Sequence, residues 1–154
     1  MIKINVLVSN ENWKKLIKNP DQYLKKKLNK LNKKEVFFKK RKIEFSLLLS
    51  GNKEIKKINY KFRKKNKVTD VLSFPFYNTK ILKKLLNKNK LFYLGDIIIN
   101  LDKIYPLYKN LEFKKNFDKL WLHGFLHLLG ERHKLNKDYI KMVNLEKKFF
   151  KYLN

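Results

Sequence analysis

The sequence predicts an α+β fold in which a small mixed β-sheet of about four strands packs with about five helices. The first observation is the length of 154 residues, which suits a single domain over residues 1–154. The second is a hydrophobic content of 44%, with 14% aromatic residues, which is enough for a core and excludes a disordered chain. The third is that strand-like and helix-like segments are interspersed, without an internal repeat or a Gly/Ser-rich linker.

The first half of the chain is expected to hold two strands and two helices. Residues 2–8 alternate between apolar and mostly polar side chains, which is typical of a half-buried strand. A helix is expected to begin at Pro20, because proline suits the first helical position and leucines follow at helical spacing. Residues 32–41 are interpreted as a basic, solvated connector with room for its few apolar side chains to tuck in. A strand over residues 42–50 and a short amphipathic helix over residues 54–63 follow.

The second half is expected to hold two further strands and two longer helices. Residues 71–77 form a strand candidate whose proline lacks an N–H and therefore lies at an edge or near the strand end. Residues 79–90 are a Lys/Asn-rich connector with weak helical character, and residues 92–101 are the most apolar strand candidate. An apolar stripe at helical spacing then ends near Gly130, and residues 138–152 form the last helix.

Two absences narrow the class of protein. The chain has no cysteine, which excludes disulfide partners, thiol nucleophiles, iron–sulfur clusters and Cys-ligated zinc. No apolar run reaches the length of a transmembrane helix, and the first residues lack the architecture of a signal peptide. We therefore expect a cytoplasmic protein with no membrane partner.

The charge is extreme, with 39 Lys and Arg against 13 Asp and Glu, for a formal net charge of +26. Such a charge favours a polyanionic partner, above all nucleic acid. The alternative is mutational, because only 3 of the 39 cationic residues are Arg, alanine is absent and residues with GC-rich codons are scarce. In an AT-biased genome lysine fills any tolerant surface position, so much of the charge needs no functional reason.

The three histidines of the chain all lie in one window of eleven residues, HGFLHLLGERH. His123 and His127 are four residues apart on a predicted helix, so both side chains leave the same face. Gly130 is expected to end that helix and to let the chain turn His133 back toward the pair. Three imidazoles with a water in the fourth position form a common catalytic zinc site, in which the pKa of the bound water is about 7. The sequence thus predicts one zinc ion per chain at the end of a central helix.

Other interpretations of this window remain open. A lone histidine is more often a core or surface residue than a ligand, and a structural zinc site would need a fourth ligand, for which Glu131 is a candidate. The spacing also matches the zinc protease pattern H-E-x-x-H-x-x-G-x-x-H. That pattern needs a glutamate as general base where this chain has Gly124, so a zinc peptidase is disfavoured.

Three ordered blocks carry a resemblance to a known family. They are INYKFRKKNKVTDVLSFP at 58–75, LGDI at 94–97 and HGFLHLLGERH at 123–133. Together they resemble the YbeY family of rRNA maturation endoribonucleases. The resemblance implies a single-domain metalloprotein that cleaves single-stranded RNA, matures the 16S rRNA 3′ end and takes part in ribosome quality control. It also implies an rRNA precursor and the small ribosomal subunit as partners, in the bacterial cytoplasm.

The resemblance also implies roles for individual residues. His123, His127 and His133 match the family's metal ligands, and Arg63 matches a cleft arginine that engages RNA phosphate. The predicted catalytic residues are therefore Arg63 and the three histidines. The predicted RNA-binding residues are Arg63 and its neighbours Lys61 and Lys65. A supporting block lines or stabilises the cleft and consists of Asn59, Thr69, Asp70, Leu72, Ser73, Phe74 and Pro75.

Carboxylates are the open question. Where the family commonly has acidic residues, this chain has Asn66 and Arg132, so neither position supplies a catalytic carboxylate. A metal-stabilised ribosome-assembly factor that binds RNA without cleaving it is therefore the alternative function. Asp70 is expected either to orient a ligand histidine or to cap a turn. Asp96, on an apolar strand, is expected to be buried and hydrogen-bonded, with a hydrogen bond that supports a metal ligand as the alternative.

Overall fold

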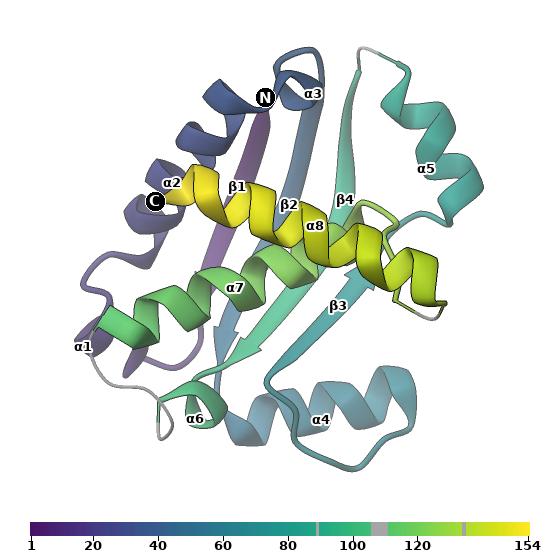
Figure 1. Cartoon of the computed structure of the whole chain (residues 1–154). Coiled ribbons are helices and arrows are strands. Elements are labelled where there is room, and N and C mark those ends of the chain that lie inside the picture. The colour runs from purple at the N-terminus through teal and green to yellow at the C-terminus, as the bar shows by residue number, and fades with distance from the viewer. Residues whose placement is uncertain (89, 106–110, 134) are drawn as a thin grey trace.

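The computed structural model describes residues 1–88, 90–105, 111–133 and 135–154, and a four-stranded mixed sheet forms its centre (Figure 1). The sheet order is β1-β2-β4-β3, with β1, β2 and β4 parallel and β3 antiparallel to β4 at the edge. The strand bounds are β1 Ile2–Val8, β2 Lys42–Ser50, β3 Val71–Pro75 and β4 Leu91–Asn100. This arrangement confirms the predicted α+β class and explains why Pro75 is tolerated, since it ends an edge strand.

Eight helices occur in the described residues, against about five expected. Their bounds are α1 Trp13–Leu16, α2 Pro20–Lys34, α3 Val36–Lys39, α4 Asn52–Arg63, α5 Thr79–Leu86, α6 Leu101–Ile104, α7 Leu111–Leu128 and α8 Asn136–Leu153. The three unexpected helices, α1, α3 and α6, are single turns of four residues each. Such turns are too short for periodicity to reveal them. No helix in the described ranges combines the length and apolarity that a membrane crossing would need.

Two segments interpreted as polar connectors are more ordered than expected. Residues 32–41 contain the end of α2 and all of α3. Phe38 is fully buried, and its ring centroid lies 5.9 Å from that of Phe125 and 5.7 Å from that of Phe149. Residues 79–90 contain α5, whose first turn is capped where Asn78 Oδ1 accepts the Ile81 N–H at 3.0 Å. In both segments a few buried apolar side chains outweigh a lysine-rich composition.

The main core lies between one face of the sheet and the helices α2, α7 and α8. In Figure 1, α7 and α8 cross in front of the strands and α2 lies beside β1. Residues Ile97 and Ile99 of β4 belong to this core, whereas Ile98 points to the other face, as alternation along a strand requires. On that second face Ile98 packs with Leu72 of β3 and Ile55 of α4 in a small separate cluster. The chain therefore brackets β3 and β4 with α7 on one face and α4 on the other.

Asp118 is a buried polar hub that joins α2 to α7. Its side chain is 1% exposed and accepts hydrogen bonds from the Tyr23 hydroxyl and the Trp121 Nε1–H, both at 3.0 Å. The Lys27 ammonium lies 2.8 Å from the same carboxylate. Burial, together with the neighbouring Asp118 charge, raises the pKa of Tyr23, so the phenol stays a proton donor. This hub positions the first half of α7, the helix that carries two of the three histidines.

We predict that Asp118→Ala lowers the free energy of unfolding by about 2–4 kcal/mol, because it leaves an indole N–H, a phenol and an ammonium without their shared acceptor. Urea unfolding followed by circular dichroism measures this change. Asp21→Ala removes the exposed pair with Lys25, at 2.8 Å on α2, and should change stability by less than about 1 kcal/mol. Equal losses of unfolding free energy in the two variants would contradict the stabilising role of Asp118.

Candidate metal centre

The C-terminal end of α7 brings the histidine window into a compact turn. Gly130 has a φ of +88°, a conformation that glycine adopts without strain. Its N–H donates to the His127 carbonyl, and the N–H of Glu131 donates to the Leu126 carbonyl, each at 3.0 Å. This pair of bonds is a Schellman motif, which ends the helix and reverses the chain. His133 consequently returns to His123 and His127, as the sequence predicted.

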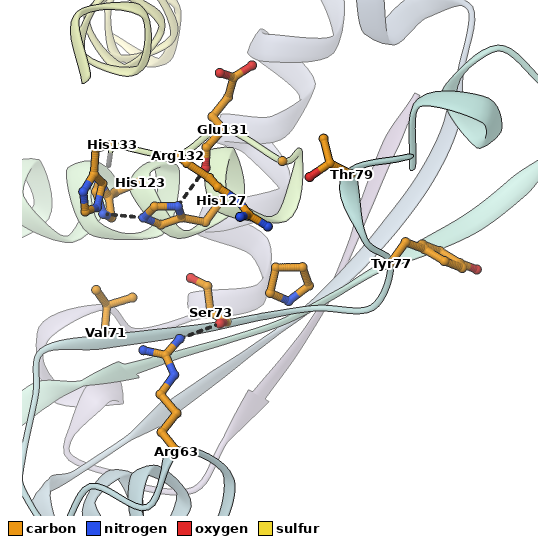
Figure 2. A pocket seen from close by; sticks show the side chains of 12 residues that line it. Arg63, Val71, Ser73, Tyr77, Thr79, His123, His127, Glu131, Arg132 and His133 are labelled. Atoms are coloured by element: carbon orange, nitrogen blue, oxygen red, sulfur yellow. Dashed lines mark hydrogen bonds between the residues drawn. The ribbon is translucent and has the colours of Figure 1, made fainter. Parts of the chain in front are cut away.

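The three histidines form one cluster. One nitrogen from each ring can be chosen so that all of these nitrogens lie within 4.8 Å of one another. The Nε2 atoms of His123 and His127 are 3.0 Å apart, and the His133 ring centroid lies 5.7 and 5.0 Å from those of His123 and His127 (Figure 2). The three side chains are therefore placed to bind a metal ion.

In the rings of His123 and His127, an oxygen acceptor near Nδ1 determines that Nε2 is the nitrogen with a lone pair available for a metal. His127 Nδ1 lies 2.9 Å from the Glu131 backbone carbonyl, which can only accept, so this nitrogen carries the proton. His123 Nδ1 lies 2.6 Å from a carboxylate oxygen of Glu146 in α8. With both Nδ1 atoms donating, the Nε2 lone pairs of the neutral rings face each other and lack a shared proton. A metal cation can accept both of these lone pairs, so the residues suit a bound metal.

The protonation state of His127 also suits metal binding. Burial lowers the pKa of His127, and the nearby rings of His123 and His133 lower it further, while the Glu131 carbonyl and the Glu146 charge act in the opposite direction. A metal-binding imidazole must be unprotonated at the ligating nitrogen. His127 is therefore in the form that a metal ion requires.

Glu131, the candidate fourth ligand, is used elsewhere. Its carboxylate pairs with Lys141 of α8 at 2.6 Å and points away from the histidine rings in Figure 2. Within the described residues the metal-binding group contains the three histidines alone. Three protein ligands leave a coordination position for water or substrate, which is typical of a catalytic rather than a structural site.

Gly124 lies where α7 packs tightly against the sheet. A Cβ at this position would lie 2.9 Å from Ile97 Cγ2 of β4 and 3.0 Å from Ser73 Oγ of β3. There is consequently no space for the glutamate that a zinc peptidase needs at this position. Packing as well as chemistry thus argues against a peptidase.

A cavity of about 400 Å³ opens beside the histidines. Arg63, at the end of α4, lines it from the side opposite α7, and its Nη2 donates to the Ser73 carbonyl at 2.9 Å (Figure 2). Its guanidinium carbon lies 5.3 Å from the centre of the Phe74 ring, a cation–π distance. Arg132 lines the same cavity from the histidine side. The structure therefore brings the predicted Arg63 and the histidines to one cavity, although they are far apart in sequence.

The two predicted RNA-binding lysines lie outside this cavity. Lys61 and Lys65 are exposed beside Arg63, on α4 and in the loop after it. The Lys61 ammonium lies 5.3 Å from the centre of the exposed Phe62 ring. Neither lysine contributes to the wall of the cavity.

The aspartates of the supporting blocks do not reach the histidines. Asp70 Oδ1 accepts the Val71 N–H at 2.8 Å and the Thr69 hydroxyl at 3.1 Å, so of its two expected roles the structure favours the turn cap. The expected burial of Asp96 is wrong. Its side chain is exposed on the face away from the main core, where it accepts the Tyr93 hydroxyl at 2.6 Å. Apolar neighbours along β4 suggested burial, but part of that face is uncovered.

Glu146 is the residue of the centre that sequence reasoning missed. It lies 23 residues after His123, in a helix whose pattern is simply amphipathic. No local spacing links a carboxylate to a histidine at such a distance, and only the packing of α8 across α7 joins them.

The chain is similar to known proteins over most of its length. The family model described as Endoribonuclease YbeY matches residues 7–154. A protein named Endoribonuclease YbeY from Pelagibacter ubique is 44% identical over 156 residues, covering 99% of this chain and 97% of that protein. One of the same name from Thermodesulfovibrio yellowstonii is 36% identical, covering 83% and 76%. A Thermotoga maritima protein solved in solution has the same fold, with a TM-score of 0.62 at 22% identity over 98% of this chain and 89% of that one.

We predict that Gly124→Ala lowers the free energy of unfolding by about 1–3 kcal/mol, because the added methyl overlaps Ile97 and Ser73 and pushes α7 from the sheet. The loss should appear although alanine is the better helix former by about 1 kcal/mol. Chemical denaturation measures the change. Lys115→Ala on the exposed side of α7 controls for helix propensity and should not destabilise. A Gly124→Ala protein as stable as wild type would refute the close contact.

Proposed function

This chain belongs to the YbeY family of endoribonucleases, and from that premise we propose that it is a zinc-dependent enzyme that cleaves single-stranded RNA. The observation that carries the proposal is the cavity in which three histidines placed for a metal lie opposite an arginine. The proposal treats residues 1–154 as one catalytic domain. It extends to maturation of the 16S rRNA 3′ end and ribosome quality control, with rRNA precursors and the small subunit as partners in the bacterial cytoplasm.

His123, His127 and His133 would hold one zinc ion per chain through their free ring nitrogens. A bound zinc ion supplies Lewis acidity toward a phosphate oxygen and lowers the pKa of a coordinated water to about 7. The protein's part is to keep the two anchored rings, His123 and His127, in the correct tautomer and orientation. The Glu131 carbonyl and the Glu146 carboxylate serve that purpose, at 2.9 and 2.6 Å from their Nδ1 atoms.

Arg63 would bind the phosphate of the RNA strand in the cavity. Its bond to the Ser73 carbonyl holds the guanidinium in place while other N–H groups of the fork remain available, and such groups pair with phosphate in bidentate fashion. Arg132 adds a second cation on the opposite wall. Lys61 and Lys65 would contact neighbouring phosphates, and the net charge of +26 adds sequence-independent attraction that weakens with salt.

One observation favours a second candidate. Among the described residues that line the cavity, the single carboxylate belongs to Glu131, and it is paired with Lys141. A nuclease often uses a carboxylate as general base. A metal-stabilised assembly factor that binds RNA without cleaving it is therefore the alternative, and measuring cleavage and binding on the same preparations separates the two.

We predict that purified wild-type protein contains zinc and cleaves a single-stranded RNA, and that His127→Ala loses both properties. The metal content is measured by mass spectrometry and the cleavage by gel electrophoresis. Since the variant is purified identically, cleavage that persists in it exposes a contaminating ribonuclease. RNA binding without cleavage in the wild type would favour the assembly factor, and casein hydrolysis would favour the peptidase.

We predict that Arg63→Ala lowers kcat/KM for RNA by about 100-fold, the scale of losing one donor that stabilises developing charge. Arg63→Lys should recover only part of this, because an ammonium cannot make the bidentate contact. Zinc content should stay at the wild-type level in both. Lys137→Ala on α8 removes the same charge from an exposed position and controls for net charge. Equal losses of kcat/KM in Arg63→Ala and Lys137→Ala would show that Arg63 acts only through its contribution to the net charge.

A further inference from the structure

We propose that Glu146 of α8 is a positioning residue for the metal centre, where it sets the orientation and tautomer of His123. The proposal rests on zinc binding, which is one part of the proposed function, and it does not require that RNA is cleaved. It makes the last helix of the chain a component of the centre as well as of the core.

The contact has the geometry that such a role requires. Glu146 Oε1 lies 2.6 Å from His123 Nδ1, at the short end of charge-assisted hydrogen bonds. The other nitrogen of the same ring, Nε2, lies 3.0 Å from His127 Nε2 within the histidine cluster. A carboxylate on Nδ1 therefore leaves Nε2 as the ligating atom and makes the imidazole a stronger donor to a metal. Glu146 itself is outside the group that could hold the ion.

A surface ion pair that merely fastens α8 is the competing explanation. Both side chains are about one-third exposed, at 33% for His123 and 32% for Glu146. However, other ion pairs also hold α8 against the rest of the protein. Lys141 pairs with Glu131 and Lys148 pairs with Glu35, each at 2.6 Å.

Buried side chains also hold α8 without Glu146. Met142, Phe149 and Leu153 of this helix are all at most 5% exposed and belong to the main core. Removal of Glu146 should therefore leave α8 docked. The feature that separates Glu146 from the other ion pairs of α8 is its partner, a ring of the histidine cluster.

The test compares zinc affinities of wild type, Glu146→Ala, Glu146→Gln and Lys148→Met, measured by competition with a chromophoric chelator. Lys148→Met is the matched control, because it breaks an equally short ion pair of α8, with Glu35, that involves neither a histidine nor a residue of the cavity. We expect Glu146→Ala to weaken zinc binding by about 10–100-fold. Glu146→Gln should lose less, because its amide oxygen can accept the same Nδ1–H, and Lys148→Met should bind like wild type.

Two further readouts exclude a merely structural effect. The unfolding temperature of the zinc-free protein should be similar in all four proteins, whereas the increase caused by zinc should shrink in Glu146→Ala. The visible absorption of the cobalt-substituted protein should change in Glu146→Ala and remain unchanged in Lys148→Met. Wild-type zinc affinity in Glu146→Ala, or an equal loss in Lys148→Met, would overturn the role of Glu146 and leave the proposed function standing. A wild-type protein that binds no zinc would overturn this role and the proposed function together.

Discussion

The close approach of α7 to the sheet at Gly124 is the constraint on which the rest of the centre depends. The absence of a side chain there lets the helix rest on Ile97 and Ser73, where a Cβ would lie at 2.9 and 3.0 Å. The carbonyl of the same Ser73 receives the Arg63 guanidinium at 2.9 Å. Ser73 of β3 thus supports the histidine helix, together with Ile97 of β4, and also fastens the arginine. The edge strand is the common reference for both sides of the cavity.

Three residues in or just after α7 place the histidines. Asp118 joins the helix to α2 through the Tyr23 hydroxyl and the Lys27 ammonium, Gly124 lets it pack closely on the sheet, and Gly130 ends it so that His133 returns. The turn at Gly130 has a second consequence, because it presents the Glu131 carbonyl to His127. The turn that brings His133 to the cluster therefore also orients His127, so the folded backbone preorganises this side chain for metal binding.

Local spacing was sufficient to predict the parts of the centre that are close in sequence. The four-residue separation of His123 and His127 and the glycine after them predicted a shared helix face and a turn, and both are present. Spacing also predicted four strands, because each has its own hydrophobic pattern. Gly124 was understood from sequence only as the loss of a general base, whereas the structure adds a packing reason.

The contacts that join distant segments could not be predicted in this way. Glu146 reaches His123, and Asp118 reaches Tyr23 and Lys27, through helix packing, which a hydrophobic pattern does not specify residue by residue. Asp96 was misplaced for a related reason, because an apolar strand does not reveal which part of its second face a helix will cover. The large positive charge was the least informative feature, since lysines are spread over the surface while the centre depends on histidines and scarce arginines and glycines.

The most direct test of the central claim, that the three histidines form a metal-dependent site for RNA cleavage, is reconstitution. Protein freed of metal with a chelator is titrated with zinc while cleavage of a single-stranded RNA is followed. We expect no cleavage at the start and an increase that saturates at one zinc ion per chain, matching the single cluster in the described residues. Full cleavage by the metal-free protein, or a saturation point unrelated to one ion per chain, would contradict it.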